Sequence, residues 1–262
     1  MNDTLAAAQT IAAARRNRTP LGPLAGDLRP QTEAQGYRVQ DAVHELIAAD
    51  FGALVGYKIG CTSAVMQQYL DIPHPCRGGV FAGGVHRSGA SLSHEAFVRV
   101  GVECEIAVRL ARDLAAPQAP FTAEFVAQAV EAYLPAIEIV DDRYVDWPTL
   151  GAPTLVADDF FAAGCVLGTP IARAAAPDLL DVAGRAIVNG VEIGRGTGAD
   201  VLGHPHNALA WLANHLATGN KGLRAGQIVL TGSLVKTAWL NAGDEVAMEL
   251  EGLGRVSVDF RA

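Results

Sequence analysis

Two glutamates stand one residue apart inside an otherwise mostly apolar run, GVECEIAVRL, at residues 101–110. If this run is a β-strand, its side chains alternate between two faces, so Glu103 and Glu105 share a face. Neighbouring residues on one face lie roughly 6.5 to 7 Å apart, which allows both carboxylates to reach one cation. The same alternation is typical of a half-buried strand that shows its polar face to water, so the pair alone leaves both interpretations open.

A third acid follows the same pattern in YLPAIEIVDDR, where Glu138 is flanked by two isoleucines that point to the other face of a second strand. Three carboxylates on two strands form an oxygen-only set that suits Mg²⁺ or Mn²⁺. Asp141 and Asp142 compete with Glu138 for the third position. The alternative is a strand end that carries solvated acids.

The lysine of VGYKIG, Lys58, is an unusual cation because it stands mid-strand among apolar residues and glycines. Such a lysine commonly extends its ammonium to the surface. If it faces the acids instead, it can pair with a substrate carboxylate or move a proton. Burial and the carboxylates then push its pKa in opposite directions.

Small residues and hydroxyls end a further strand in LTGSL, which contains Thr231, Gly232 and Ser233. Backbone N–H groups in such a stretch can approach an anionic ligand, although a plain turn has the same composition. His204 and His206 stand in a loop before a helix and lack the i, i+4 spacing of a metalloprotease helix. The sequence has no nucleophile elbow, P-loop or dinucleotide-binding fingerprint.

The elements that must position these residues follow from periodicity and turn signals. Alanine- and leucine-rich helical spacing predicts helices over 4–16, 32–50, 122–134 and 205–217. Strands are predicted near 54–60, 98–110, 136–141, 163–168, 185–195, 227–231 and 245–259, with a hairpin turn at Asn189-Gly190 and another at 252–254. We therefore expect an α+β protein with an N-terminal helical segment (1–50) and a sheet-rich catalytic core (51–262) in one structural domain.

Composition narrows the class of protein. Half of the 262 residues are hydrophobic and 18% are charged, which indicates a well-packed globular protein. A net charge of −8 without a basic block argues against nucleic-acid binding. The N-terminal stretch has the pattern of neither a secretory signal nor a membrane anchor, so a cytoplasmic location is expected. The four cysteines lack metal-site spacing and are expected to be reduced thiols, with Cys76 in a loop and Cys61, Cys104 and Cys165 in apolar runs.

Five segments in this order resemble the 2-keto-4-pentenoate hydratase and 4-oxalocrotonate decarboxylase branch of the fumarylacetoacetate hydrolase superfamily, a group of aromatic catabolism enzymes. They are GYKIGCTSAVMQQYL, VECEIAVRL, PAIEIVDDR, GTGADVLGHPHNALAWLAN and GQIVLTGSL, and the resemblance runs from about residue 35 to 260. It implies a mixed β-roll core with peripheral helices, assembled as a homo-oligomer.

The resemblance also implies roles for individual residues. Glu103, Glu105 and Glu138 would hold the divalent ion, with Asp141 in reserve, and Lys58 would be the catalytic lysine. The segment of Thr231, Gly232 and Ser233 would lie near the substrate.

One departure concerns the stretch HPCRGGVF, where members of the hydratase group carry an acidic PD(F/Y)G segment. Cys76 stands at the aspartate position, as a neutral filler or a replacement acid. Arg77 stands at the aromatic position and could bind a second substrate carboxylate. In the stretch LVADDFFAAGC, relatives often carry asparagine and small residues, so Asp158, Asp159 and the two phenylalanines could reshape the pocket.

The favoured function is a metal-dependent hydratase that adds water to a 2-hydroxy-2,4-dienoate and yields a 4-hydroxy-2-oxo acid. The metal would stabilise the enolate that forms when the substrate tautomerises. Alternatives are a 2-oxo-3-enedioate decarboxylase, which Arg77 favours, an acylpyruvate-type C–C hydrolase, and a non-catalytic ligand-binding paralogue.

Overall fold

A large mixed sheet forms the centre of the protein. The computed structural model describes residues 2–63, 67–68 and 71–262. In these residues the main sheet has the strand order β2-β1-β11-β5-β6-β7-β3, with β12 beside β5 and β8 beside β6. The strands are β1 (Leu54–Gly60), β2 (Cys76–Phe81), β3 (Val85–Arg87), β5 (Val100–Leu110), β6 (Val130–Asp141), β7 (Ala162–Leu167), β8 (Ile171–Ala172), β11 (Ile228–Ser233) and β12 (Ala238–Trp239).

A second sheet packs against the main one and has the order β10-β9-β13-β14-β4. Its strands are β4 (Ala90–Ser93), β9 (Ala183–Val188), β10 (Val191–Thr197), β13 (Glu245–Leu250) and β14 (Gly254–Arg261). Asn189 and Gly190 both have positive φ in the turn between β9 and β10, which confirms the predicted hairpin. Two mixed or antiparallel sheets with peripheral helices confirm the expected α+β class and its β-roll core.

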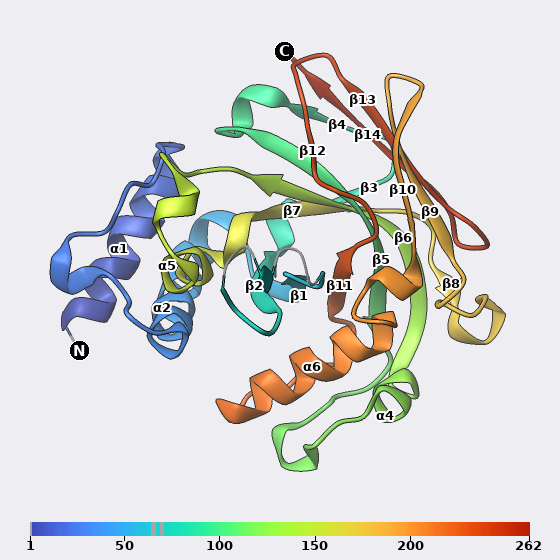
Figure 1. Ribbon diagram of the computed structural model, residues 1–262, viewed down its shortest axis with the longest axis horizontal. Helices are drawn as coiled ribbons and strands as arrows, with labels where there is room; N and C mark the ends of the chain where they lie inside the picture. Colours follow the sequence, from blue (N-terminus) through green and yellow to red (C-terminus); the bar gives the residue numbers. More distant parts are fainter. Residues whose placement is uncertain (1, 64–66, 69–70) are drawn as a thin grey trace.

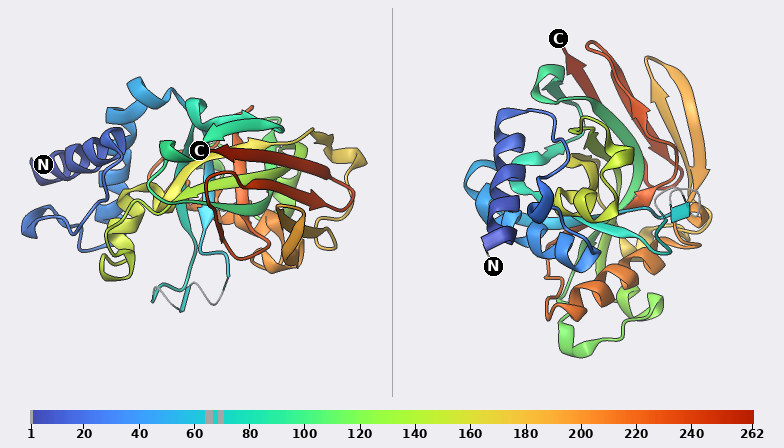
Figure 2. Two further views of the ribbon diagram at one scale, coloured as in Figure 1. Left: turned by 90° about the horizontal axis from the view of Figure 1, so that it is seen from above. Right: turned by 60° about the vertical axis from the view of Figure 1, so that its left-hand side comes forward.

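Five helices in the described part of the chain lie outside the sheets (Figures 1 and 2). They are α1 (Asn2–Asn17), α2 (Glu33–Phe51), α4 (Ala123–Ala127), α5 (Ala152–Ala157) and α6 (Pro205–Thr218). A capping box between Thr32 and Gln35 starts α2, and Gly52 with a φ of 83° follows its last residue. Helices α1, α2 and α5 share a hydrophobic cluster with part of β2. No helix among the described residues has the length and apolar character of a membrane span.

Strand register divides the main sheet into two faces. Lys58 of β1 pairs with Leu230 of β11, and Leu230 pairs with Ala107 of β5. Residues opposite each other share a face, so Lys58 lies on the same face as Ala107 and as the glutamates two and four residues before it. The other face carries Ile59, Cys104 and their neighbours, which pack in the core between the two sheets.

Two expectations about local structure were wrong. The predicted helix over 122–134 ends after α4, and the chain then forms β6 from Val130, six residues earlier than expected. Pairing of β6 with β5 along its length stabilises the extended form from Val130 onward instead. Cys76 begins strand β2 and is buried, whereas the sequence placed it in a loop.

Candidate metal centre

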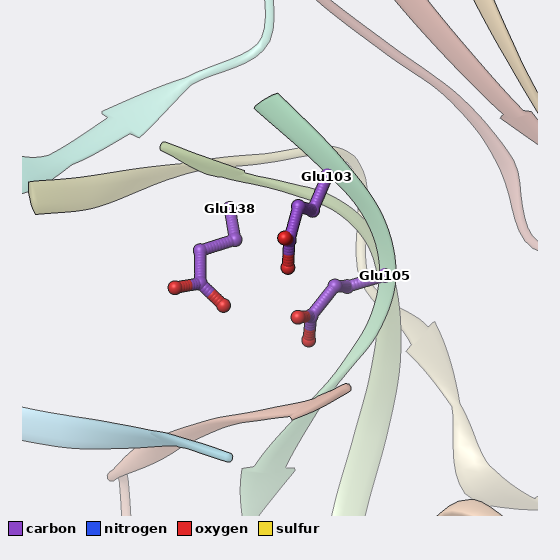
Figure 3. Close-up of side chains that lie close together, drawn as sticks. All are labelled: Glu103, Glu105 and Glu138. Carbon is purple, nitrogen blue, oxygen red and sulfur yellow. The ribbon is translucent and has the colours of Figure 1, made fainter. Parts of the chain in front are cut away.

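The three predicted glutamates converge. Glu103 and Glu105 extend from β5, and Glu138 extends from β6 directly opposite Glu103 (Figure 3). One carboxylate oxygen from each lies within 4.8 Å of the other two. Strand alternation therefore brings together the set that the sequence predicted, with two acids from one strand and one from its neighbour.

Two of these acids are buried, in contrast to the water-exposed polar face considered from the sequence. Glu105 is 0% exposed and Glu138 is 1% exposed, whereas Glu103 at the rim of the cluster is partly exposed. Burial and the facing Glu138 carboxylate raise the pKa of Glu103 to about 7. Burial, Glu138 and Glu103 raise the pKa of Glu105 well above its ordinary value. Buried like charges repel each other, and a cation between them would relieve that repulsion.

The available oxygen atoms fit a hard divalent cation. Among the described residues, Glu105 Oε1 and Glu138 Oε2 are buried and accept no hydrogen bond. Buried polar atoms usually have a hydrogen-bond partner, so these oxygens lack one that they would normally have. Carboxylate oxygens are also the ligands that Mg²⁺ and Mn²⁺ prefer. These three residues could therefore hold a divalent ion and leave further coordination positions to water or substrate.

Backbone and hydroxyl donors orient two of the carboxylates. The Gly232 N–H donates to Glu105 Oε2 at 2.8 Å, and the Thr237 hydroxyl donates to Glu103. Gly232 has a φ of 124°, and a Cβ there would lie 2.5 Å from Thr62 Oγ1, so glycine is required at this point. These contacts engage one oxygen of each acid, Glu105 Oε2 and Glu103 Oε1, and leave the other oxygen available for a ligand.

The predicted substrate segment contributes mainly through its backbone. The Thr231 hydroxyl donates to the Ile106 carbonyl at 2.8 Å, and the Ser233 hydroxyl donates to the Val235 carbonyl at 2.7 Å. Both hydroxyls are therefore engaged, and the contact with the acid cluster runs through Gly232. Direct contact of this segment with substrate stays a prediction.

Lys58 faces the acids and does not extend to the surface. Its side chain is 3% exposed, and its Nζ lies 2.9 Å from Glu138 Oε1. Burial opposes the charged form of Lys58, but Glu138, Glu103 and Glu105 outweigh it, so the pKa is raised. The structure thus places a positive group beside the carboxylate cluster, where it can exchange a proton with a bound molecule.

A left-handed turn also approaches Lys58. Asp159, Phe160 and Phe161 have φ values of 57°, 50° and 68°, a conformation that costs about 1 to 3 kcal/mol for each non-glycine residue. The Phe160 ring centroid lies 5.3 Å from Lys58 Nζ. The sequence suggested that this segment reshapes the pocket, and in the structure it places an aromatic ring beside the lysine.

An ionic network holds the turn in place. The Asp159 carboxylate, which is fully buried, lies 2.6 Å from His44 Nε2 and 3.0 Å from Arg15 Nη2, and accepts the Gly79 N–H at 2.8 Å. Burial disfavours its charge, yet His44 and Arg15 hold the pKa of Asp159 well below its usual range. Asp158 pairs with Arg15 and with a second arginine of the loop after β6. The sequence flagged both aspartates but gave no sign of their partners.

Cys76 lies on the face of β1 and β2 that carries Lys58, because it pairs with Gly60 two residues further along. It is 0% exposed and shares a hydrogen bond with the thiol of Cys61. This hydrogen bond and burial raise the pKa of Cys76 well above its ordinary value. A neutral thiol supports the filler interpretation over that of a replacement acid.

Arg77 points away from the acids. It pairs with Ile59, so it lies on the face of β1 and β2 opposite to Lys58. Its guanidinium lies over the Tyr37 ring at 4.5 Å and donates to Gln40 of α2. The predicted role in binding a second carboxylate beside the metal is therefore not supported by its position.

The remaining predicted candidates lie outside the cluster. Asp141 accepts the N–H groups of Val98 and Arg99 at 3.0 and 2.8 Å, which gives its carboxylate a structural role at the start of β5. His204 caps α6, where its Nδ1 accepts the His206 N–H at 2.9 Å. Thr237, which contacts Glu103, was missed because a single threonine in LVKTAW carries no signal in the sequence.

Comparisons with known proteins assign the chain to a family. The fumarylacetoacetate (FAA) hydrolase C-terminal model matches residues 82–261. A 2-keto-4-pentenoate hydratase of Paraburkholderia phymatum is 36% identical over 248 residues, which cover 94% of this chain and 93% of the relative. A 2-hydroxyhexa-2,4-dienoate hydratase of Comamonas testosteroni is 34% identical over 254 residues, covering 96% and 95%.

Solved structures agree with the sequence relatives. The 4-oxalocrotonate decarboxylase of Pseudomonas putida G7, complexed with magnesium and adipate, superposes with a TM-score of 0.93 at 26% identity, covering 99% of this chain and 97% of the other. The chain belongs to the fumarylacetoacetate hydrolase family. Within it, the protein is an enzyme of the branch that contains the 2-keto-4-pentenoate hydratases and the 4-oxalocrotonate decarboxylase.

Proposed function

We propose that the protein is a divalent-metal-dependent hydratase that acts on a short 2-hydroxy-2,4-dienoate of the 2-keto-4-pentenoate type and yields a 4-hydroxy-2-oxo acid. The observation that carries this proposal is the buried Lys58 ammonium 2.9 Å from Glu138 within a convergent acid cluster. The hydratases that match this chain over nearly its full length support the same reaction.

Glu103, Glu105 and Glu138 would hold Mg²⁺ or Mn²⁺, the ions present in related structures. When bound, such an ion supplies positive charge for the carboxylate and the adjacent oxygen of a 2-hydroxy acid. The Gly232 N–H and the Thr237 hydroxyl keep two of the three carboxylates oriented for this purpose. The buried surroundings exclude bulk water and strengthen these electrostatic interactions.

Lys58 would perform the proton transfers. The enol oxygen of the dienoate loses its proton, and the far end of the conjugated chain gains one, which gives a 2-oxo-3-enoate. Water then adds across the remaining C=C bond, with its hydroxyl group bonding to C4 and its proton to C3. Glu138 holds the ammonium in place between these steps.

The similarity to the magnesium-bound decarboxylase favours a second candidate, the decarboxylation of a 2-oxo-3-enedioate. The same site would stabilise the enolate left when CO₂ departs. Arg77 lies on the opposite face of β1 and β2, so the described residues offer less support for the second carboxylate of such a substrate than the sequence suggested.

Incubation of the purified protein and Mg²⁺ with 2-hydroxypenta-2,4-dienoate and 2-oxohex-3-enedioate separates these functions. A hydratase converts the first compound to a product heavier by one water, as mass spectrometry detects. A decarboxylase releases CO₂ from the second. The proposal fails if neither compound is hydrated. A third incubation, with an acylpyruvate, tests the hydrolase alternative by its C–C cleavage, and binding of these compounds without turnover would identify the non-catalytic alternative.

We also propose that the enzyme is a homo-oligomer in the cytoplasm. Val191 and Ile193 of the edge strand β10 are 64% and 48% exposed, which supports further association. The four cysteines are buried free thiols, as expected for a reducing compartment. Light scattering coupled to size-exclusion chromatography tests the assembly, and a monomer at micromolar concentration would contradict it.

A further inference from the structure

A slot on the inner face of β1 and β2 receives the turn of Asp159–Phe161. Gly60 and Gly78 lie on the Lys58 face of these strands, Gly78 directly opposite Lys58 and Gly60 two residues after it. A Cβ on Gly78 would lie 2.5 Å from the Asp159 carbonyl oxygen, and one on Gly60 would lie 2.8 Å from the Phe160 ring. The two glycines thus allow the turn to lie directly against the backbone of both strands.

The Phe160 ring occupies this slot next to the lysine. It is 5% exposed, and the same Cβ position on Gly60 that contacts the ring is 3.3 Å from Lys58 Nζ. The ammonium is therefore close to both an aromatic ring, 5.3 Å from its centroid, and the Glu138 carboxylate, 2.9 Å away. Cation–π attraction and the Glu138 ion pair together restrict the rotamers open to a long lysine side chain.

The turn that presents the ring adopts an unfavourable backbone conformation that other contacts maintain. Its three consecutive residues have left-handed φ values, and Asp159 is held by Arg15 of α1, His44 of α2 and the Gly79 N–H of β2. A strained segment that several elements hold in one place is typical of a functional site. The network thus connects the N-terminal helices to the side of Lys58.

We propose that Phe160 is a positioning residue, which covers Lys58 and holds its ammonium at Glu138, and that the Asp159 network fixes the ring in that role. The inference rests on the proposed function where it concerns turnover, because Lys58 is there the group that moves protons. It commits to Phe160, because the Phe160 ring lies beside Lys58, whereas the Phe161 ring packs on Tyr144 and Trp147 and on the edge of the Phe160 ring.

Chemical labelling of the lysines tests the covering directly and requires no substrate. The chain contains three lysines, Lys58, Lys221 and Lys236, so acetylation by acetic anhydride can be followed at each by peptide mass spectrometry. The exposed Lys236 is the internal reference. Phe160→Ala is expected to raise the rate at Lys58 relative to Lys236 by about tenfold or more, since opening the cover exposes the amine.

Further variants guard against misfolding and against general loosening of the turn. Phe160→Leu keeps much of the apolar cover and is expected to leave Lys58 protected. Gly60→Ala pushes the ring out of the slot from the other side and is expected to expose Lys58 even if Phe160→Ala does not fold. Phe125→Leu is the matched control, because that phenylalanine of α4 packs on Phe121, and it is expected to leave labelling of Lys58 unchanged.

Steady-state kinetics of dienoate hydration test whether the position of Lys58 affects turnover. Phe160→Ala is expected to lower kcat about ten- to a hundredfold with little change in KM, because misplacing a catalytic group affects the reacting geometry more than binding. Phe160→Leu is expected to restore most of kcat. Unchanged labelling of Lys58 in both Phe160→Ala and Gly60→Ala, or unchanged kcat in Phe160→Ala, would overturn the inference. Absence of turnover in the wild type refutes the proposed function, and the labelling result then decides on the covering by itself.

Discussion

Replacing Glu103 by glutamine tests the electrostatic description of the acid cluster. In the metal-free protein, burial and Glu138 raise the pKa of Glu103 from 4.5 to about 7. The folded state therefore binds the proton more tightly than the unfolded state, so the metal-free protein loses stability as pH rises from about 4.5 to 7. At 1.36 kcal/mol per pKa unit, the full loss above pH 7 is about 3 kcal/mol.

Glutamine is neutral at every pH and keeps an oxygen that can accept the Thr237 hydroxyl. We expect metal-free Glu103→Gln to be more stable than the wild type by up to about 3 kcal/mol at pH 8, or roughly 6 to 12 °C in Tm for a chain of this size. At pH 4.5 or below, the electrostatic advantage should disappear. Saturating Mg²⁺ should reverse the order at pH 8, because it stabilises the wild type by binding the folded state.

Thermal denaturation of both proteins after chelation, at pH 4.5 and pH 8 and with or without Mg²⁺, measures these differences. Glu45→Gln, at an exposed glutamate of α2, controls for the loss of one negative charge. The reasoning is refuted if Glu103→Gln and the wild type differ by the same amount at both pH values in the metal-free state, or if Mg²⁺ stabilises both equally.

Further predictions concern the lysine, the metal and the supports of the site. Lys58→Met should lower kcat by about a hundredfold or more while isothermal titration still detects metal binding, since general acid–base groups contribute about 10²- to 10⁴-fold. Removal of divalent ions with a chelator should abolish hydration of the dienoate, and Mg²⁺ or Mn²⁺ but not K⁺ should restore it in a stopped assay. Asp159→Asn should destabilise the protein by about 3 to 5 kcal/mol in urea denaturation at pH 7, because Arg15 and His44 lose a buried partner. Because the pKa of Asp159 is lowered in the folded state, the difference in stability between this variant and the wild type should shrink as pH falls below about 4. Gly232→Ala should weaken Mg²⁺ binding, because its Cβ would collide with Thr62 and move the N–H that orients Glu105. The control Gly226→Ala, at a positive φ with open space around it, should leave Mg²⁺ binding unchanged.

Many helices and strands could be predicted because local sequence patterns determine their conformation. The β9–β10 hairpin followed from Asn189-Gly190, whose residues adopt the positive φ values that the turn needs. Helix α2 followed from alanine and leucine spaced on one face, and the structure adds a capping box at its start. The helix predicted over 122–134 failed because pairing with β5 determines the conformation of β6, and that partner is distant in sequence.

For the site, the sequence by itself determined which acids share a face. The period-2 geometry of a strand fixes Glu103 and Glu105 on one side whatever surrounds them, and the same alternation applies to Glu138. That geometry does not say whether the face is wet or buried, since burial depends on which elements cover it.

Only the tertiary structure decided the rest. The register of β1, β11 and β5 turned Lys58 toward the acids, and the register of β1 and β2 turned Arg77 away from them. Packing of the Asp159–Phe161 turn into a slot of glycines placed Phe160 beside the lysine. Each of these contacts joins segments 16 or more residues apart in sequence. No local pattern encodes such a contact, because it forms only when the strands fold against one another.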